Sequence, residues 1–320
     1  MPLAVPLAVH GGRAPGPRIR ARVEDTSSVL DKGSRAHPLR AASRAPIVPG
    51  MPSVAAIQMT SGPDVEANLQ EARALLAEAA EEGAHLAVLP ENFSFMGLSD
   101  GDKRRIAEDD GRGPVQDFLA QSARRLGMWI VGGTVPLRGA GDGRVAAASL
   151  VYDSAGERRA RYDKIHLFDI QVPERAESYH ESANVAPGSK PVVLDTPVGR
   201  LGLSVCYDVR FPELFRSLSA SGAELLAVPS AFTEPTGRAH WEVLVRARAI
   251  ENLCAVIAPA QSGFHPNGRE TYGDSMIVDH WGRVLDRLPR GRGCVTAEID
   301  LERQRRDRVS FPSLTHRVLN

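Results

Sequence analysis

The stretch GAHLAVLPENF at residues 83–93 resembles GAELLAVPSAF at residues 222–232, and each reads as a helix end at glycine followed by a buried strand. A second pair follows in the same order, SLVYDSAGERRAR at 149–161 and SMIVDHWGRVLDR at 275–287. An internal duplication of an α/β unit explains both pairs most simply, although chance similarity between two ordinary α/β segments is the alternative. We therefore expect two like halves, packed sheet against sheet with helices outside.

Each half contains a similar series of expected elements. In the first half, the apolar run at 54–60 predicts a strand, and Asp64 reads as the N-cap of a helix that ends at Gly83. In the second half, a strand at 200–208 precedes a helix at 212–222. The other expected strands cover 85–90, 128–133, 146–153, 224–230 and 254–260, the other helices cover 114–126 and 239–252, and the segment 274–286 closes the second half. This alternation is typical of the α/β class.

Residues 1–50 differ from the rest of the chain. They are rich in Pro, Arg, Ala and Gly and show no sustained apolar periodicity, so they cannot bury enough apolar surface to offset the entropy lost on ordering. A disordered tail, a targeting peptide and a leader translated upstream of a true start at Met51 all fit this composition. We favour a dispensable disordered extension or a mis-assigned start, and we assign the folded domain to residues 51–320.

Composition restricts the classes of partner. The formal net charge is zero and the sequence pI is about 7.1, which argues against nucleic acid and an anionic membrane surface as partners. No uncharged apolar run approaches the roughly 18 residues that would suggest a membrane span. The three cysteines show no close pairing and no metal-ligand spacing, so we expect a reducing cytoplasm, no disulfide framework and no metal site.

Cys206 is the candidate nucleophile. It ends the apolar run LGLSV just before a tight turn, and the next helix is expected to open near Pro212. A thiol that faces a helix N-terminus should have a lowered pKa, and backbone N–H groups at such a turn can hold an oxyanion. A small buried side chain is the alternative reading of Cys206. Cys254, in an apolar run, and Cys294, in an expected strand, read as structural.

Glu91 and Lys164 are candidate partners of the thiol. Glu91 follows Pro90 where a buried strand emerges, so we expect partial desolvation to raise its pKa and suit it to general-base work. Lys164, in RYDKIHLF, is flanked by apolar residues, and a fixed ammonium there could stabilise charge on a substrate oxygen. An exposed loop is the alternative for both. No spacing selects a histidine as base from the three that were considered, which are His166, His240 and His265.

Together these motifs resemble the nitrilase superfamily of carbon–nitrogen hydrolases, from about Val54 to the C-terminus. LAVLPENF carries the family glutamate at Glu91, YDKIHLFD the family lysine at Lys164 and GLSVCYDVRFPEL the family cysteine at Cys206. HESANVAPG places Glu181 where members carry a second glutamate that positions the lysine. The resemblance implies a four-layer α-β-β-α sandwich, no cofactor, and a homodimer or larger homo-oligomer formed partly through the helix after the cysteine.

The resemblance also implies a reaction. Cys206 would attack a small amide to give a thioester, Glu91 would transfer protons, and Lys164 with the Tyr207 backbone N–H would hold the oxyanion. Phe232 and Thr233 follow the second-half strand and are expected in the pocket wall, with packing roles as the alternative.

Within the superfamily the chain is most similar to the Nit branch. By this resemblance, FPEL after the cysteine and APAQSGFHPNGRETYG at 258–273 favour deaminated glutathione as the substrate, hydrolysed to 2-oxoglutarate and cysteinylglycine, and 2-oxoglutaramate is the alternative. Other possibilities are nitrilase or N-carbamoyl hydrolase activity, and a non-catalytic interaction protein. Asp274 departs from the histidine that many relatives carry in TYGHS, and it could lie near the substrate.

Overall fold

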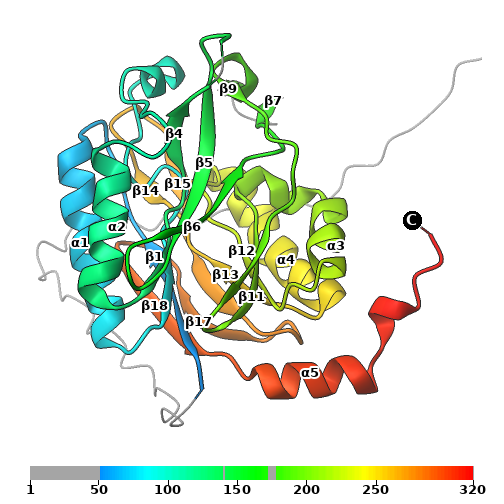
Figure 1. Cartoon of the computed structure of the whole chain (residues 1–320). Coiled ribbons are helices and arrows are strands. Elements are labelled where there is room, and N and C mark those ends of the chain that lie inside the picture. Colours follow the sequence, from blue (N-terminus) through cyan, green and yellow to red (C-terminus); the bar gives the residue numbers. More distant parts are fainter. Residues whose placement is uncertain (1–50, 140, 172–177, 320) are drawn as a thin grey trace, which may run out of the picture. The chain divides into compact units, whose positions relative to one another are not determined.

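The structure is a computed structural model that describes residues 51–139, 141–171 and 178–319 (Figure 1). The expected tail at residues 1–50 lies outside the described residues. The unit formed by residues 47–320 contains two large β-sheets. Among the described residues, no helix is long and apolar enough to span a membrane.

The first sheet has eight strands among the described residues, and six of them run in the order β18–β1–β2–β3–β5–β4, while β6 and β9 also pair with β5. Its strands are β1 (Ser53–Gln58), β2 (Leu86–Val88), β3 (Trp129–Val131), β4 (Val135–Arg138), β5 (Val145–Tyr152), β6 (Arg158–Asp163), β9 (Val185–Ala186) and β18 (Gly293–Glu298). Helices α1 (Val65–Glu81) and α2 (Pro114–Leu126) belong to this half. The predicted cap of α1 is confirmed, because the Asp64 carboxylate accepts from the Ala67 N–H.

The second sheet has the order β10–β11–β12–β13–β16–β17. Its strands are β10 (Val193–Thr196), β11 (Gly199–Leu203), β12 (Leu225–Ala227), β13 (Ala255–Ala258), β16 (Ser275–Val278) and β17 (Val284–Leu288). Helices α3 (Pro212–Ala220) and α4 (Glu234–Asn252) accompany this sheet. Two small hairpins join β7 (Asp169–Gln171) to β8 (Ser178–His180) and β14 (Ser262–Phe264) to β15 (Glu270–Tyr272).

The predicted four layers are confirmed. Figure 1 shows α1 and α2 on one side, α3 and α4 on the other, and the two sheets between them. Alternation along β1 explains this arrangement, since Ala55 and Ile57 belong to the core under α1 and α2, whereas Val54 and Ala56 join the core that contains the second sheet. Strands with both faces covered read as continuous apolar runs, as they do in this sequence.

The two halves repeat each other in detail. In the first, β1, β2 and β3 are parallel and are followed by antiparallel β5 and β6; in the second, β11, β12 and β13 are parallel and are followed by antiparallel β16 and β17. The turn after β5 and the turn after β16 also match. The N–H of Gly156 donates to the Asp153 carbonyl at 2.8 Å, and the N–H of Gly282 donates to the Asp279 carbonyl at 2.9 Å. The duplication inferred from sequence is therefore a structural one.

Two predicted boundaries differ most from the structure, and one helix was not predicted. The strand expected at 200–208 ends at Leu203, because the chain turns there toward a short 3₁₀ helix, Cys206–Arg210. The helix expected at 239–252 begins earlier, at Glu234, with Pro235 in its first turn. The C-terminal helix α5 (Leu301–Ser310) was not anticipated, because its sequence LERQRRDRVS has almost no apolar face.

Candidate active site

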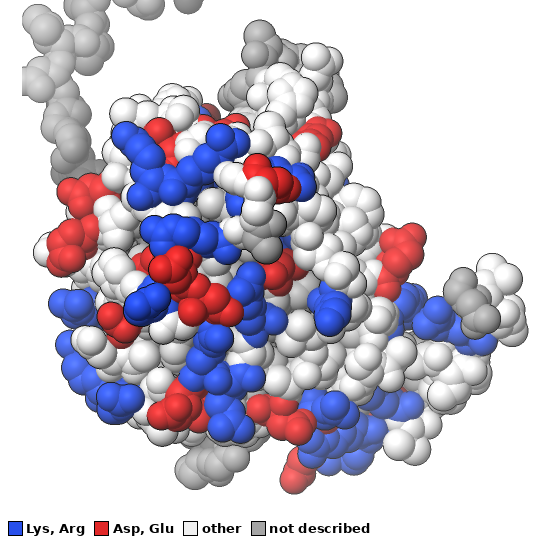
Figure 2. Space-filling view, turned by 45° about the horizontal axis from the view of Figure 1, so that its top comes forward, with Lys and Arg blue, Asp and Glu red and all other residues white. Residues whose placement is uncertain are grey.

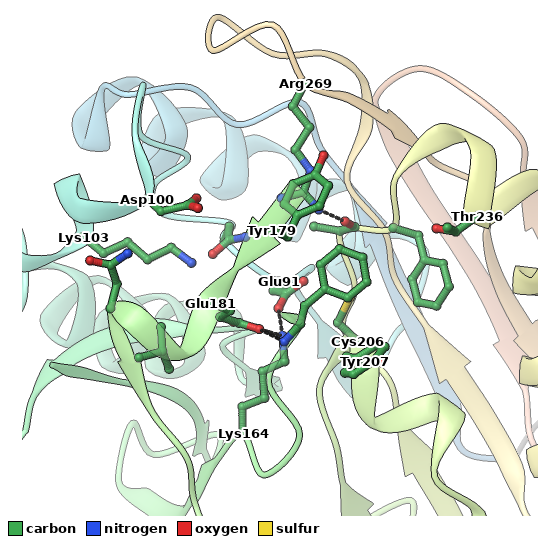
Figure 3. Close-up of a pocket in the computed structure, with 16 residues that line it drawn as sticks. Glu91, Asp100, Lys103, Lys164, Tyr179, Glu181, Cys206, Tyr207, Thr236 and Arg269 are labelled. Atoms are coloured by element: carbon green, nitrogen blue, oxygen red, sulfur yellow. Dashed lines mark hydrogen bonds and ion pairs between the residues drawn. The ribbon is translucent and has the colours of Figure 1, made fainter. Parts of the chain in front are cut away.

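A pocket opens beside the ends of the parallel strands of both halves (Figure 3). Four of the residues predicted to carry chemistry, Glu91, Lys164, Glu181 and Cys206, line this pocket. The other lining residues are Asn92, Asp100, Lys103, Phe168, Tyr179, Asn184, Val185, Tyr207, Ala231, Phe232, Thr236 and Arg269. Sequence segments far apart along the chain therefore converge on one cavity.

Cys206 occupies a strained position in the backbone. Its φ is 48°, in the left-handed region that a residue with a side chain rarely adopts, and strain of this kind persists where the surrounding structure fixes it. The N–H of Cys206 donates to the Pro229 carbonyl at 2.9 Å. Tyr207 follows in the first turn of the 3₁₀ helix, where backbone N–H groups have no partner within the helix.

Asp208 holds the cysteine turn in place. Its fully buried carboxylate accepts from the Val205 N–H at 2.8 Å, from the Tyr162 hydroxyl at 2.6 Å and from the His166 N–H at 3.0 Å, and it contacts His166 Nδ1 at 2.7 Å. Tyr162 and His166 flank Lys164 in sequence. The single carboxylate of Asp208 thus joins the turn that bears Cys206 to the segment that bears Lys164.

Lys164 is a buried cation between two carboxylates. Its side chain is 2% exposed, and Nζ lies 2.8 Å from Glu91 Oε1 and 2.9 Å from Glu181 Oε2. Burial alone would lower the pKa of Lys164, but the charges of Glu181 and Glu91 outweigh it and hold the pKa well above its ordinary value. The ammonium is therefore charged, as a group that stabilises negative charge must be.

The pKa of Glu91 differs in direction from the sequence expectation. Burial pushes it up, but the positive charges of Lys164 and Lys103, together with hydrogen bonds from Lys164 and the Cys206 thiol, bring it below its ordinary value. The expectation of a raised pKa was wrong because it considered desolvation without the buried lysine. Glu91 is ionised at neutral pH and can accept a proton.

The expectation for the thiol also changes. Burial, with the negative charge of Glu91, raises the pKa of Cys206 despite the opposing charge of Lys164 and a hydrogen bond from the Ala231 backbone. The prediction of a thiolate stabilised by a helix N-terminus was therefore wrong. A neutral thiol beside an ionised carboxylate suits proton transfer at the moment of attack rather than a resting thiolate.

Of the two residues predicted in the pocket wall, one lines the pocket and the other does not. Phe232 lines the pocket and packs on Trp241, with ring centroids 4.9 Å apart. Thr233 is fully buried and does not line the pocket. Its hydroxyl lies 2.7 Å from the hydroxyl of Thr236, which does line the pocket. Asp274 does not line the pocket either. Its carboxylate is paired with Arg287, whose Nε and Nη2 atoms donate to Oδ1 at 2.5 Å and to Oδ2 at 2.8 Å.

The remaining cysteines and histidines have other contacts. The Cys254 thiol is fully buried against the Ala223 carbonyl, and Cys294 lies half-buried on β18. His240 contacts Arg210, and His265 is held between the Ser61 carbonyl and the Thr271 hydroxyl; the contacts of His166 with Asp208 are described above. Over the described ranges, no three His, Cys, Asp or Glu side chains gather as metal ligands would.

Two pocket cations were missed by the sequence analysis. Lys103 lies on the short 3₁₀ helix Asp100–Arg104, and Arg269 lies between strands β14 and β15. Arg269 Cζ is 5.0 Å from the Tyr179 ring centroid, and Nη2 donates to the Ala231 carbonyl at 2.6 Å. Both residues belong to loop-like segments without apolar periodicity, so only the three-dimensional structure brings them to the pocket.

Comparisons with known proteins agree with this geometry. A sequence profile described as carbon–nitrogen hydrolase matches residues 53–309. The deaminated glutathione amidase of Synechocystis sp. (strain PCC 6803 / GT-S) is 46% identical over 267 residues, which cover 82% of this chain and 97% of that protein. The deaminated glutathione amidase of Homo sapiens is 40% identical over 270 residues, covering 83% of this chain and 82% of that protein.

Solved structures show the same relationship. The Caenorhabditis elegans NitFhit protein superposes with a TM-score of 0.78 at 40% identity, covering 85% of this chain and 66% of that longer chain. Saccharomyces cerevisiae Nit3, described as a member of branch 10 of the nitrilase superfamily, superposes with a TM-score of 0.74 at 31% identity, covering 84% of this chain and 97% of that chain.

Proposed function

Because the chain belongs to the carbon–nitrogen hydrolase family and is an amidase, we propose that it hydrolyses deaminated glutathione with Cys206 as the nucleophile. Several proteins named deaminated glutathione amidase are at least 40% identical to it over most of its length. The products would be 2-oxoglutarate and cysteinylglycine, so the reaction would recover useful metabolites from a by-product of stray transamination. The convergence of Cys206, Glu91 and Lys164 in one pocket carries the proposal.

In the first half-reaction, the ionised Glu91 accepts the thiol proton as Cys206 Sγ attacks the amide carbonyl. The oxyanion of the tetrahedral intermediate is held by Lys164 Nζ and the Tyr207 backbone N–H. Donors fixed before the reaction stabilise developing charge by about 3–4 kcal/mol each in other acyl-transfer enzymes. Glu181 keeps Lys164 charged and in place through its ion pair at 2.9 Å.

The first half-reaction ends when Glu91 gives its proton to the leaving amine and a thioester remains on Cys206, and hydrolysis of this thioester is the second half-reaction. Glu91 then removes a proton from a water molecule that attacks the thioester. When the second tetrahedral intermediate collapses and the acid is released, Glu91 returns its proton to the departing Cys206 thiolate, which restores the neutral thiol and the ionised carboxylate. One carboxylate with a lowered pKa therefore acts as base, acid, base and acid in turn.

Hydrolysis of two substrates by wild type and Cys206→Ala tests this function. We expect wild type to have a higher kcat/KM for deaminated glutathione than for 2-oxoglutaramate, and Cys206→Ala to hydrolyse neither. A preference for 2-oxoglutaramate would move the protein to the omega-amidases and keep the mechanism. Retained turnover in Cys206→Ala, with the fold verified by circular dichroism, would exclude Cys206 as the nucleophile.

The assembly and location are part of the proposal. On α4, Val243 is 69% exposed and Ile250 is 49% exposed, and their spacing of seven residues puts them on one face of the helix. We propose that this face and the adjacent α3 pair with a second copy of the chain. Light scattering of Val243→Asp should then give a smaller mass than wild type. The three cysteines lie far apart in the sequence and do not form the spacing of a disulfide framework, which supports a cytoplasmic location.

A further inference from the structure

The pocket contains two cations without a carboxylate partner. The Lys103 side chain makes no ion pair or hydrogen bond within the described part of the chain, although Asp100 lies on the same short helix. Arg269 makes no ion pair there either, and its Nε atom is buried without a hydrogen-bond partner. A buried N–H donor without an acceptor is costly, and a ligand carboxylate would supply that acceptor.

The two cations approach the reacting centre from different sides. Figure 3 shows Lys103 entering from the left of the view, on the Glu91 side of Cys206, and Arg269 entering from the top beside Tyr179. The charge of Lys103 acts on Glu91, which agrees with this placement. Arg269 instead donates to the carbonyl of Ala231, whose own N–H faces the Cys206 thiol.

In the proposed mechanism, the two sides of the pocket bind different parts of the substrate. Glu91 donates its proton to the leaving amine, so the amine part of a substrate lies on the Glu91 side of the scissile bond. The acyl part then extends the other way, past Ala231. Deaminated glutathione carries one carboxylate on its acyl part and one on its amine part, and both cations can form charge-assisted hydrogen bonds with a carboxylate.

We propose that Arg269 binds the carboxylate of the acyl part and Lys103 binds the carboxylate of the leaving amine, so that the pocket selects amides with an anion at both ends. This inference rests on the proposed function for the direction in which the substrate lies. Figure 2 shows that Lys and Arg side chains on the visible face are interspersed with Asp and Glu. Selection of a dianion by a broad surface field is therefore less favoured than selection by the two pocket cations.

Three substrates separate the two roles. Deaminated glutathione has both carboxylates, its glycinamide form lacks the carboxylate of the amine part, and N-(4-oxopentanoyl)-cysteinylglycine keeps the keto group but lacks the carboxylate of the acyl part. Lys103→Met and Arg269→Gln each remove one charge at similar length. Arg105→Met is the matched control, because Arg105 is exposed near Lys103, pairs with Asp102 and lies outside the pocket lining.

The quantity to measure is the ratio of kcat/KM between substrates. In Lys103→Met we expect the preference for deaminated glutathione over its glycinamide form to fall about 10- to 100-fold, the range for a lost charge-assisted hydrogen bond. In Arg269→Gln the preference for deaminated glutathione over N-(4-oxopentanoyl)-cysteinylglycine should fall by a similar factor. The other ratio in each variant, and both ratios in Arg105→Met, should stay within about twofold.

Calorimetric binding in a Cys206→Ala background separates failure of this inference from failure of the proposed function. If wild type hydrolyses none of the substrates but each cation variant loses affinity only for ligands with its carboxylate, the two subsites stand and the proposed reaction falls. If turnover occurs but each variant lowers both kcat/KM ratios equally, or lowers neither, the two subsites are disproved. The proposed amidase reaction is then retained. If no ligand binds and none is hydrolysed, both proposals are overturned.

Discussion

The two halves of the domain share strand order, turns and helix ends, but they carry different residues at corresponding positions. In the paired segments 83–93 and 222–232, Glu91 corresponds to Ser230. When the alignment of segments 149–161 and 275–287 is extended without a gap, Lys164 corresponds to Arg290. Val54 pairs with Leu86 in the first sheet, and Leu201 pairs with Leu225 in the second. Because Leu86 corresponds to Leu225, Val54 corresponds to Leu201, and five residues further along the chain Met59 corresponds to Cys206.

The counterparts of the candidate catalytic residues are occupied with structural contacts. The Ser230 hydroxyl donates to the Val228 carbonyl at 3.0 Å, and Arg290 is 3.3 Å from Glu270. Met59 is a fully buried core residue. The comparison shows that each strand end in one half has a counterpart in the other half. The chemistry depends on which side chains lie at those strand ends. The proposed site combines Glu91 and Lys164 from the first half with Cys206 from the second.

The largest expected contrast is between Glu91→Gln and Ser230→Ala. Removing the carboxylate takes away the acceptor for the thiol proton, so we expect kcat to fall about 10³-fold or more. Ser230→Ala removes only a local hydrogen bond, worth about 1 kcal/mol of stability, and should leave kcat within a few-fold of wild type. Steady-state kinetics with thermal unfolding as a check would decide. More than a tenth of wild-type activity in Glu91→Gln would contradict the assignment.

A smaller effect concerns the pH dependence of Cys206 alkylation. With the pKa of Glu91 lowered and that of Cys206 raised, the pair holds one proton between those two pKa values. The fraction that can react, with the proton on Glu91, is therefore constant across neutral pH. Iodoacetamide should label Cys206 faster than Cys254 or Cys294, at a rate nearly independent of pH from about 6 to 8.

The control for this experiment is the same measurement in Glu91→Gln. Without the carboxylate, reaction requires the free thiolate, whose fraction rises about tenfold per pH unit below the thiol pKa. A steep pH dependence in wild type as well would mean that Glu91 does not take the proton.

The comparison also shows what sequence could predict. The Asp64 cap follows from local turn chemistry, the two halves follow from the repeated segments, and the four layers are what the family resemblance implies. Local reasoning about desolvation and helix dipoles gave the opposite sign for both pKa shifts. Burial raises the pKa of Glu91, but the fold brings Lys164 beside it and lowers that pKa below its ordinary value, whereas burial and the charge of Glu91 raise the pKa of Cys206. Lys103 and Arg269 sit in short irregular segments whose position no periodic pattern encodes.

The same limit applies to smaller features of the pocket. Thr233 follows the strand as expected, but its side chain turns inward to the hydroxyl of Thr236, one turn of helix further on. A helix start at Glu234 rather than near His240 decides this, and the segment EPTGR contains no apolar residue that would have marked the first turn as buried. Sequence reasoning therefore identified the strand end correctly and missed the residue that reaches the cavity.

The smallest expected effect compares the two matching turns. Gly156 and Gly282 have φ of 77° and 83°, so alanine should cost about 1–2 kcal/mol at either position. A Cβ at Gly156 would lie 2.5 Å from the backbone carbonyl oxygen of Ala120, whereas a Cβ at Gly282 would lie 2.6 Å from Ile250 Cδ1, at the end of a flexible side chain. We therefore expect Gly156→Ala to lower the free energy of unfolding by about 1 kcal/mol more than Gly282→Ala.

Urea unfolding at one protein concentration measures this difference, provided that the slope with denaturant is unchanged between the variants. Because both turns lie away from the pocket lining, kcat/KM should stay near the wild-type value in the two proteins. Equal losses of stability would mean that α2, which carries Ala120, shifts as easily as the Ile250 side chain rotates. The two halves would then be equivalent in their mechanics as well as in their topology, and would differ only in the side chains at their strand ends.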